Sequence, residues 1–105
     1  MNERDFNIAR ELKGRLSGMV ELLDFRIFGS RARGDADEYS DMDVFVEVER
    51  LDKNLKDMIL DIAWDIGFHN LMVIAPLIFT RNELENTSLR ASPIVNVIFA
   101  EGVQV

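Results

Sequence analysis

Two short apolar segments, residues 22–28 and 42–48, frame a polar stretch that opens with Gly29-Ser30 and closes with Asp41-Met42-Asp43. In both segments apolar residues take every second position, as in β-strands with one buried face. They are Leu23, Phe25 and Ile27 in the first segment, and Met42, Val44, Val46 and Val48 in the second. The polar stretch must therefore connect two strands, so that its glycine, serine and aspartates lie at an end of the sheet.

Helical spacing marks two further segments, one before and one after these strands. Residues 3–19 and 52–67 carry apolar residues at intervals of mostly three and four, which predicts amphipathic helices. Asp52 is suited to cap the start of the second helix. Gly67 is predicted to end it.

The run 71–79 is apolar and predicts a buried strand, in which Pro76 indicates a bulge, an edge or a bend. Thr80 and Glu83 follow it with the spacing of a capping box, which favours a helix over the next residues.

Ser92-Pro93 is typical of an N-cap and a first helical residue, and it predicts a short helix that extends to about Ala100 and ends at Gly102. The tail, residues 103–105, is a candidate last strand. The helix between the second and third strands suggests a crossover connection, whereas the first two strands can form a hairpin. We expect one domain, residues 1–105, of the α/β (α+β) class, with a small mixed β-sheet and helices packed on it.

The 105 residues carry a formal net charge of −7 and include no cysteine. This charge argues against general nucleic-acid binding, which needs a basic face, but local arginines can still bind a single nucleotide. No apolar run reaches the roughly 18 residues of a membrane span. With no cysteine and no signal-like N-terminus, we expect a cytoplasmic protein.

The two aspartates that open the second strand are candidate metal ligands. Side chains of Asp41 and Asp43 point the same way along a strand, and their Cα atoms lie roughly 6.5–7 Å apart. Mg²⁺ favours one or two carboxylates together with phosphate oxygens and water. A site for one Mg²⁺ ion, or for a pair, is therefore expected here.

The glycine-serine pair is a candidate phosphate cradle. Gly29 allows the backbone to turn sharply and approach a ligand, and Ser30 adds a hydroxyl. Residues 31–40 are expected to form a polar turn or a short helix, whose first N–H groups can bind phosphate. Arg31 and Arg33 can add charge-assisted contacts. A cradle that faces two carboxylates is suited to metal-assisted phosphoryl or nucleotidyl transfer.

Other interpretations of these residues are weaker. Asp35 and Asp37 form a second Asp-x-Asp pair, and most such pairs are solvated turns. The chain has no P-loop motif and no G-x-G-x-x-G motif. A calcium loop that starts at Asp35 would have Ser40 where glycine is needed. His69 has no partner at ligand spacing, which favours a helix-terminal role over zinc binding.

The spacing of Gly29-Ser30, ten residues and Asp41-x-Asp43 resembles the signature of the polymerase-beta-like nucleotidyltransferase superfamily. The stretch "GSRARGDADEYSDMDVFVEV" is most similar to minimal nucleotidyltransferase (MNT) domains. In HEPN/MNT toxin–antitoxin pairs the MNT protein is the antitoxin, and members transfer AMP from ATP to a tyrosine of the HEPN toxin. The resemblance implies a nucleotidyltransferase that uses Mg²⁺ and ATP or another nucleoside triphosphate, with a HEPN-domain partner.

Carried over by position, the resemblance implies that Gly29 and Ser30 bind the phosphates and that Asp41 and Asp43 bind Mg²⁺ and act in catalysis. It also suggests phosphate contacts for Arg31 and Arg33. Active members typically carry a third carboxylate on the next core strand, and residues 70–80 contain no acid. Two functions follow: a transferase, or an antitoxin or regulatory subunit that has kept the nucleotide cradle and acts by binding its partner.

Two features hint at association with another chain. Trp64 lies off the centre of the apolar stripe of the helix over 52–67, and the segment 92–100 is apolar for a terminal helix. Trp64 and the apolar segment 92–100 can equally serve to complete a small core. The chain is thus a candidate for a homo- or hetero-oligomer.

Overall fold

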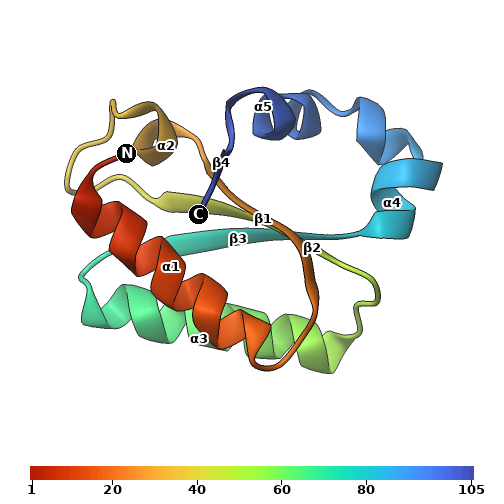
Figure 1. Cartoon of the computed structure of the whole chain (residues 1–105), viewed down its shortest axis with the longest axis horizontal. Coiled ribbons are helices and arrows are strands. Elements are labelled where there is room, and N and C mark those ends of the chain that lie inside the picture. The colour runs from red at the N-terminus through yellow and green to blue at the C-terminus, as the bar shows by residue number, and fades with distance from the viewer.

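The computed structural model describes all 105 residues as a four-stranded mixed sheet with helices on both faces, which confirms the predicted small mixed sheet with helices packed on it (Figure 1). The order of strands in the sheet is β3-β2-β1-β4. The elements are α1 Glu3–Ser17, β1 Leu22–Phe28, α2 Ser30–Arg33, β2 Met42–Val48, α3 Lys53–His69, β3 Ile74–Thr80, α4 Arg81–Asn86, a 3₁₀ turn at Ser88–Ala91, α5 Pro93–Glu101 and β4 Val103–Gln104.

The strands pair as their connections require. β1 and β2 are antiparallel, and their register sets Phe28 opposite Asp43. β2 and β3 run parallel because α3 crosses between them, and Asp43 stands opposite Ala75 in that register. β4 is antiparallel to β1, which confirms the last strand expected from the tail.

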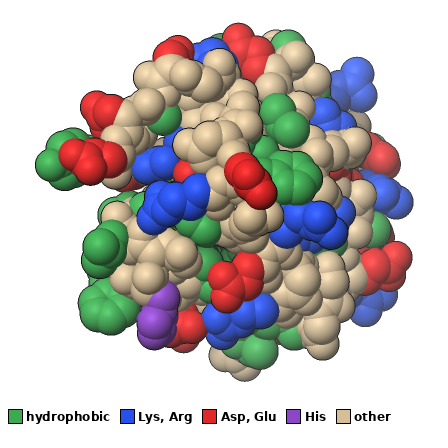
Figure 2. Space-filling view, turned by 60° about the vertical axis from the view of Figure 1, so that its left-hand side comes forward, with side chains coloured by type: hydrophobic (Ala, Val, Ile, Leu, Met, Phe, Trp, Pro, Cys, Tyr) green, Lys and Arg blue, Asp and Glu red, His purple; other side chains and the backbone are tan.

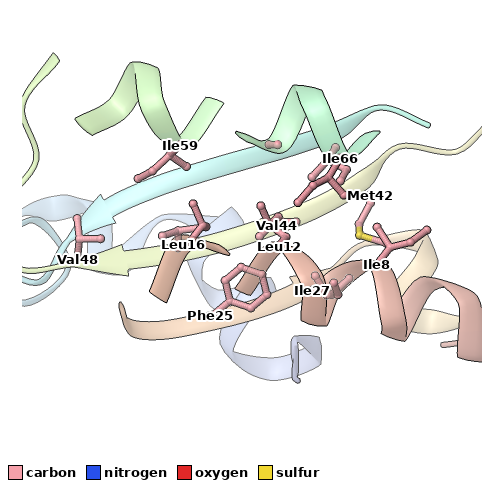
Figure 3. Close-up of a cluster of buried hydrophobic side chains, with 14 residues drawn as sticks. Ile8, Leu12, Leu16, Phe25, Ile27, Met42, Val44, Val48, Ile59 and Ile66 are labelled. Carbon is pink, nitrogen blue, oxygen red and sulfur yellow. The ribbon is translucent and has the colours of Figure 1, made fainter. Parts of the chain in front are cut away.

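One face of the sheet is closed by α1 and α3, which lie side by side beneath it in Figure 1. The alternate residues of β2 that the sequence assigned to one face all point into this layer. Figure 3 shows them meeting side chains from both helices, such as Leu12 and Ile59. The cluster consists of Ile8, Ala9, Leu12, Leu16, Phe25, Ile27, Met42, Val44, Val46, Val48, Ile59, Ala63, Ile66 and Ile74.

The opposite face is covered only in part, by α4 and α5. A smaller cluster lies there and is made of Phe28, Phe45, Leu84, Val95 and Ile98. Asp43 shares this face because it alternates with Met42 and Val44. The candidate aspartates therefore lie on the less covered side of the sheet.

Three predicted boundaries were wrong. Helix α1 ends at Ser17 and not at residue 19. Helix α3 continues through Gly67 to His69. A Cβ atom at Gly67 would lie 2.6 Å from the carbonyl oxygen of Met72, so this glycine serves a close contact between the helix and the returning chain. The strand after it starts at Ile74, because residues 71–73 form the turn that leads into it.

β3 was also predicted to be a buried strand, and most of it is only half-buried. The reason is its place at the edge of the sheet, where Pro76 is tolerated because an edge strand has one side without ladder bonds. The capping box of Thr80 and Glu83 is present at the start of α4. Ser92 occupies the N-cap position of α5, but its side chain makes no capping hydrogen bond.

Candidate functional site

The connection between β1 and β2 begins with a backbone conformation that suits glycine. Gly29 has a φ of 76°, in the region that other residues rarely adopt, and its carbonyl accepts a hydrogen bond of 3.1 Å from the N–H of Arg33. Helix α2 follows at once, opened by the half-buried Ser30. Gly34, with a φ of 86°, ends the helix and sends the chain back toward β2.

The glycine and an aspartate are in direct contact. A Cβ atom at Gly29 would lie 2.4 Å from Oδ2 of Asp43, closer than such atoms approach in proteins. The antiparallel register explains the contact, since Asp43 stands opposite Phe28, the residue before the glycine. The absence of a side chain at residue 29 is thus what makes room for the carboxylate.

Three charged side chains influence one another at this end of the sheet. Partial burial raises the pKa of Asp43, the negative charge of Asp41 raises it further, and the positive charge of Arg33 lowers it. Asp41 is exposed and directly precedes β2. Two carboxylates near each other repel, and a divalent cation between them relieves that repulsion. This pair of hard oxygen donors fits Mg²⁺.

Arg33 lies at the outer side of the connection. Its guanidinium is exposed and contacts Asp35, at 3.2 Å, and Glu101, at 3.5 Å. The hydrogen bond to Asp35 raises the pKa of Arg33. Its side chain is accessible to a ligand, in keeping with a phosphate contact. Glu101, at the end of α5, was missed by sequence reasoning, because only the tertiary fold brings α5 to this point.

Arg31 is placed differently, although it was predicted to bind phosphate too. It is 4% exposed, and its Nη1 lies 3.0 Å from both carboxylate oxygens of Asp5 in α1. Its other nitrogens donate to backbone carbonyls of the loop: Nε to Ser40 at 2.9 Å, and Nη2 to Asp37 at 3.3 Å and Glu38 at 3.4 Å. With its donors occupied, Arg31 holds the loop to α1, and these contacts do not favour a role in phosphate binding.

No third carboxylate joins Asp41 and Asp43, and no cluster of three metal-ligating side chains occurs in the structure. Ala75 stands opposite Asp43 on β3. Glu47 shares the sheet face of Asp43 but is paired with Arg81 at 3.3 Å. Glu83 accepts hydrogen bonds from Thr80 in the capping box.

In the structure, Gly29-Ser30 follows β1, and Asp41-x-Asp43 lies at the start of the antiparallel strand β2. This arrangement agrees with the nucleotidyltransferase signature that the sequence resembles. The family model described as "Nucleotidyltransferase domain" matches residues 9–100, and the chain therefore belongs to this family. No curated protein sequence matches the chain.

Two solved structures share the fold. One is a crystal structure described as "the toxin-antitoxin with AMP-PNP", with a TM-score of 0.59, 18% identity, and coverage of 99% of this chain and 72% of that one. The other is a putative nucleotidyltransferase from Sulfolobus solfataricus, with a TM-score of 0.53, 19% identity, and coverage of 96% and 78%. At these identities the likeness concerns the fold alone. None of the helices is long and apolar enough to cross a membrane.

Proposed function

We propose that this chain is a Mg²⁺-dependent nucleotidyltransferase that acts as an antitoxin and transfers AMP from ATP to a tyrosine hydroxyl of a HEPN-domain partner. The contact between Gly29 and the carboxylate of Asp43 carries this proposal, because it joins the turn that would cradle phosphates to the strand that would hold the metal. Membership of the nucleotidyltransferase family supports the reaction class. The fold shared with a toxin–antitoxin structure that contains AMP-PNP supports the biological setting.

Each residue has a distinct task in this proposal. Asp41 and Asp43 hold one or two Mg²⁺ ions, and the backbone at Gly29 and Ser30 binds the phosphates. Arg33, at the rim, adds a charge-assisted contact to a phosphate oxygen. When bound, Mg²⁺ neutralises charge on the phosphates and makes the α-phosphorus easier to attack.

The reaction leaves AMP on the acceptor. The tyrosine oxygen forms a bond to the α-phosphorus of ATP, and the bond from that phosphorus to the oxygen bridging to the β-phosphate breaks. Pyrophosphate leaves, and the hydroxyl proton passes to water, to the substrate or to the partner, since no third carboxylate joins the metal pair to serve as a base.

Transfer of labelled AMP tests this function. The purified chain, Mg²⁺ and α-labelled ATP are incubated with a HEPN-domain protein, and label on that protein is measured with the wild type and with the double variant Asp41→Asn/Asp43→Asn. We expect the double variant to lose at least about 100-fold in rate, because the metal ligands act at the transition state. A double variant with the same charge change, Glu11→Gln/Asp57→Asn, lies outside the site and should label normally. Equal labelling by both double variants contradicts the catalytic assignment.

A second function, antitoxin action by binding alone, is favoured by one observation: the metal pair has two carboxylates, with Ala75 opposite Asp43 on the neighbouring strand. In that case the complex with the partner and the silencing of its toxicity persist in Asp41→Asn/Asp43→Asn, and no AMP is transferred by the wild type. A rise in melting temperature with Mg²⁺ and ATP is expected for both functions and is absent for a purely structural domain.

A further inference from the structure

The two candidate metal ligands differ in how the sheet supports them. Asp43 lies inside β2, where strands flank it on both sides and place it opposite Phe28 and Ala75. Asp41 precedes β2, whose pairing with β3 begins at Met42, so its backbone lies outside the sheet. A metal ligand binds well when it is held in place before the ion arrives. Asp41 therefore needs support from another part of the fold.

The connection that carries Asp41 is an open loop at one end of the molecule (Figure 1). In Figure 2, acidic side chains project at the left edge of the molecule, and basic side chains lie at the base of this projection. The exposed acidic residues of the connection are Asp35, Asp37, Glu38 and Asp41. Like charges this close in the chain repel one another, so the loop requires a positive charge and fixed hydrogen bonds to keep one shape.

Arg31 supplies both the charge and the hydrogen bonds. It is buried at the base of the connection, and its Nε donates a 2.9 Å hydrogen bond to the carbonyl of Ser40, the residue before Asp41. Its Nη2 donates to the carbonyls of Asp37, at 3.3 Å, and Glu38, at 3.4 Å. One guanidinium thus binds the backbone at three positions of the acidic stretch.

The backbone on the other side of Asp41 is fixed as well. The N–H of Met42 donates a 2.9 Å hydrogen bond to the carbonyl of Val73, just before β3. The peptide groups on both sides of Asp41 are therefore held, one by Arg31 and the other by the chain that leads into β3. The side-chain torsions of Asp41 remain free, while the backbone that carries its carboxylate is fixed.

Arg31 is itself held by α1. Its Nη1 lies 3.0 Å from both carboxylate oxygens of Asp5, and the side chains of Arg31 and Asp5 are only 4% and 3% exposed. The backbone N–H of Asp5 donates a 2.7 Å hydrogen bond to Oδ1 of Asn2, the N-cap of α1. Arg4 approaches Asp5 only at 4.0 Å. The contacts that fix Asp41 therefore start from a long helix packed on the sheet.

We propose that Arg31 is a positioning residue of the metal site. It holds the carbonyl of Ser40, and through it the carboxylate of Asp41, where Asp43 can share a Mg²⁺ ion with it. Asp5 serves the same purpose, because it fixes the guanidinium of Arg31. The inference rests on the proposed function, whose metal it concerns, and it gives Arg31 a role other than contact with phosphate.

Arg31→Lys tests this role directly. Lysine keeps a positive charge beside Asp5, but its single nitrogen cannot also reach the carbonyl of Ser40. Mn²⁺, a paramagnetic stand-in for Mg²⁺ at carboxylate ligands, is titrated into the chain, and the free ion is measured by electron paramagnetic resonance. The temperature is one at which circular dichroism shows every variant to be folded. We expect the Kd for Mn²⁺ to rise about tenfold or more, and an unchanged Kd overturns the proposal.

The double variant Asp5→Leu/Arg31→Met separates positioning from stability. Apolar side chains of similar size often replace a buried ion pair without loss of stability, so this variant should fold. The carbonyl of Ser40 nevertheless loses its donor, and we expect the affinity for Mn²⁺ to fall as in Arg31→Lys. Affinity equal to that of the wild type contradicts the proposal.

Leu16→Ala is the matched control for stability. It truncates a fully buried side chain at the other end of α1, so it should lower the melting temperature and leave the affinity for Mn²⁺ unchanged. A loss of Mn²⁺ affinity equal to that of Arg31→Lys would show that the effect follows stability alone, and it would overturn the proposal.

Inorganic tripolyphosphate, titrated by calorimetry without divalent ions, tests the alternative role of Arg31. We expect Arg31→Lys to bind it as the wild type does. Weaker binding of tripolyphosphate with unchanged binding of Mn²⁺ would make Arg31 a phosphate ligand and overturn the proposal. Absence of Mn²⁺ binding in the wild type contradicts the proposed function and this inference with it. Equal Mn²⁺ binding by the wild type and Arg31→Lys contradicts this inference alone.

Discussion

Arg31 and Arg33 lie two residues apart in the same short helix, yet they serve opposite sides of the β1–β2 connection. The inner side faces α1, where Arg31 is buried against Asp5 and bound to the loop carbonyls. The outer side faces α5, where Arg33 is exposed and touches Asp35 and Glu101. The difference separates support from binding: one arginine fixes the loop that carries Asp41, and the other remains accessible to a ligand.

On the inner side, Arg31 holds the loop in place because the buried charges of Arg31 and Asp5 have hydrogen-bond partners. A buried ion pair gains little net stability by itself, but removal of one partner leaves an uncompensated charge in the interior. Here no buried side-chain polar atom lacks a hydrogen-bond partner. Loss of Arg31 would therefore take both short contacts from the carboxylate of Asp5 and leave three loop carbonyls without their donor.

Arg31→Ala is the change with the largest expected effect. We expect it to lower the free energy of unfolding by about 3–5 kcal/mol, because Asp5 is left buried with only the long 4.0 Å contact to Arg4. Urea denaturation measures this value. The double variant Asp5→Ala/Arg31→Ala should be less destabilised than the sum of the two single variants. A loss below about 1 kcal/mol for Arg31→Ala would show that the inner side does not support the loop.

Gly29→Ala tests the close contact between the start of the β1–β2 connection and the carboxylate of Asp43. The alanine would adopt a positive φ and its Cβ would clash with Oδ2 of Asp43, so we expect a loss of about 1–3 kcal/mol in stability. The rise in melting temperature with Mg²⁺ and ATP should also disappear. Gly14→Ala is the matched control, because nothing lies within 4 Å of a Cβ there and the residue is helical. It should gain roughly 0.5–1 kcal/mol. Unchanged ligand binding by Gly29→Ala would show that this glycine has no role in the site.

Arg33→Ala should separate binding from stability. Because Arg33 is exposed, we expect the melting temperature to stay within about 2 °C of the wild type. Affinity for Mg²⁺–ATP should fall about tenfold through loss of one charge-assisted contact, as measured by calorimetry. Arg33→Lys should recover part of the affinity, since it restores the charge without the planar fork. An unaltered affinity for Mg²⁺–ATP in Arg33→Ala contradicts the phosphate contact proposed for Arg33.

The smallest effect is expected from Asp43→Asn in the absence of ligands, and its sign is informative. The pKa of Asp43 is raised in the folded chain, first by burial, so the folded state holds this proton more tightly than the unfolded state. The ionised carboxylate therefore costs stability at pH 7, and the cost fades as the pH falls to the ordinary value of 3.8. Asp43→Asn should be slightly more stable than the wild type at pH 7 and should lose that advantage at low pH. Thermal unfolding from pH 3.5 to 7 measures the trend, and Mg²⁺ with ATP should reverse the order by stabilising only the wild type.

The strands that carry the site were predictable because their signal is local. Alternation of apolar residues gave β1 and β2 with the observed bounds, and the face on which Asp43 lies follows from that alternation. The glycine-serine pair at the end of β1 was likewise visible in the sequence. The family resemblance added the roles of these residues, which geometry alone does not supply.

The remaining features depend on distant parts of the chain. No local pattern distinguishes Arg31 from Arg33, because the partner of Arg31 lies 26 residues away in α1. Gly67 lies inside α3, where a Cβ atom would meet the carbonyl of Met72 in the turn that follows the helix, and the glycine signal alone does not reveal this. Glu101 reaches Arg33 only through the packing of α5. Burial and tertiary contacts decide the cases of Arg31 and Glu101, and both are properties of the assembled fold.

The proline in β3 has a consequence for how this domain associates with other molecules. An edge strand offers unpaired backbone groups on which another strand can be added, and such addition leads to fibres as readily as to complexes. Pro76 lacks an N–H group and interrupts this template in the middle of the strand. Growth of the sheet at this edge is thereby opposed, and recognition is left to side chains elsewhere on the surface, where the sequence of the partner can be discriminated.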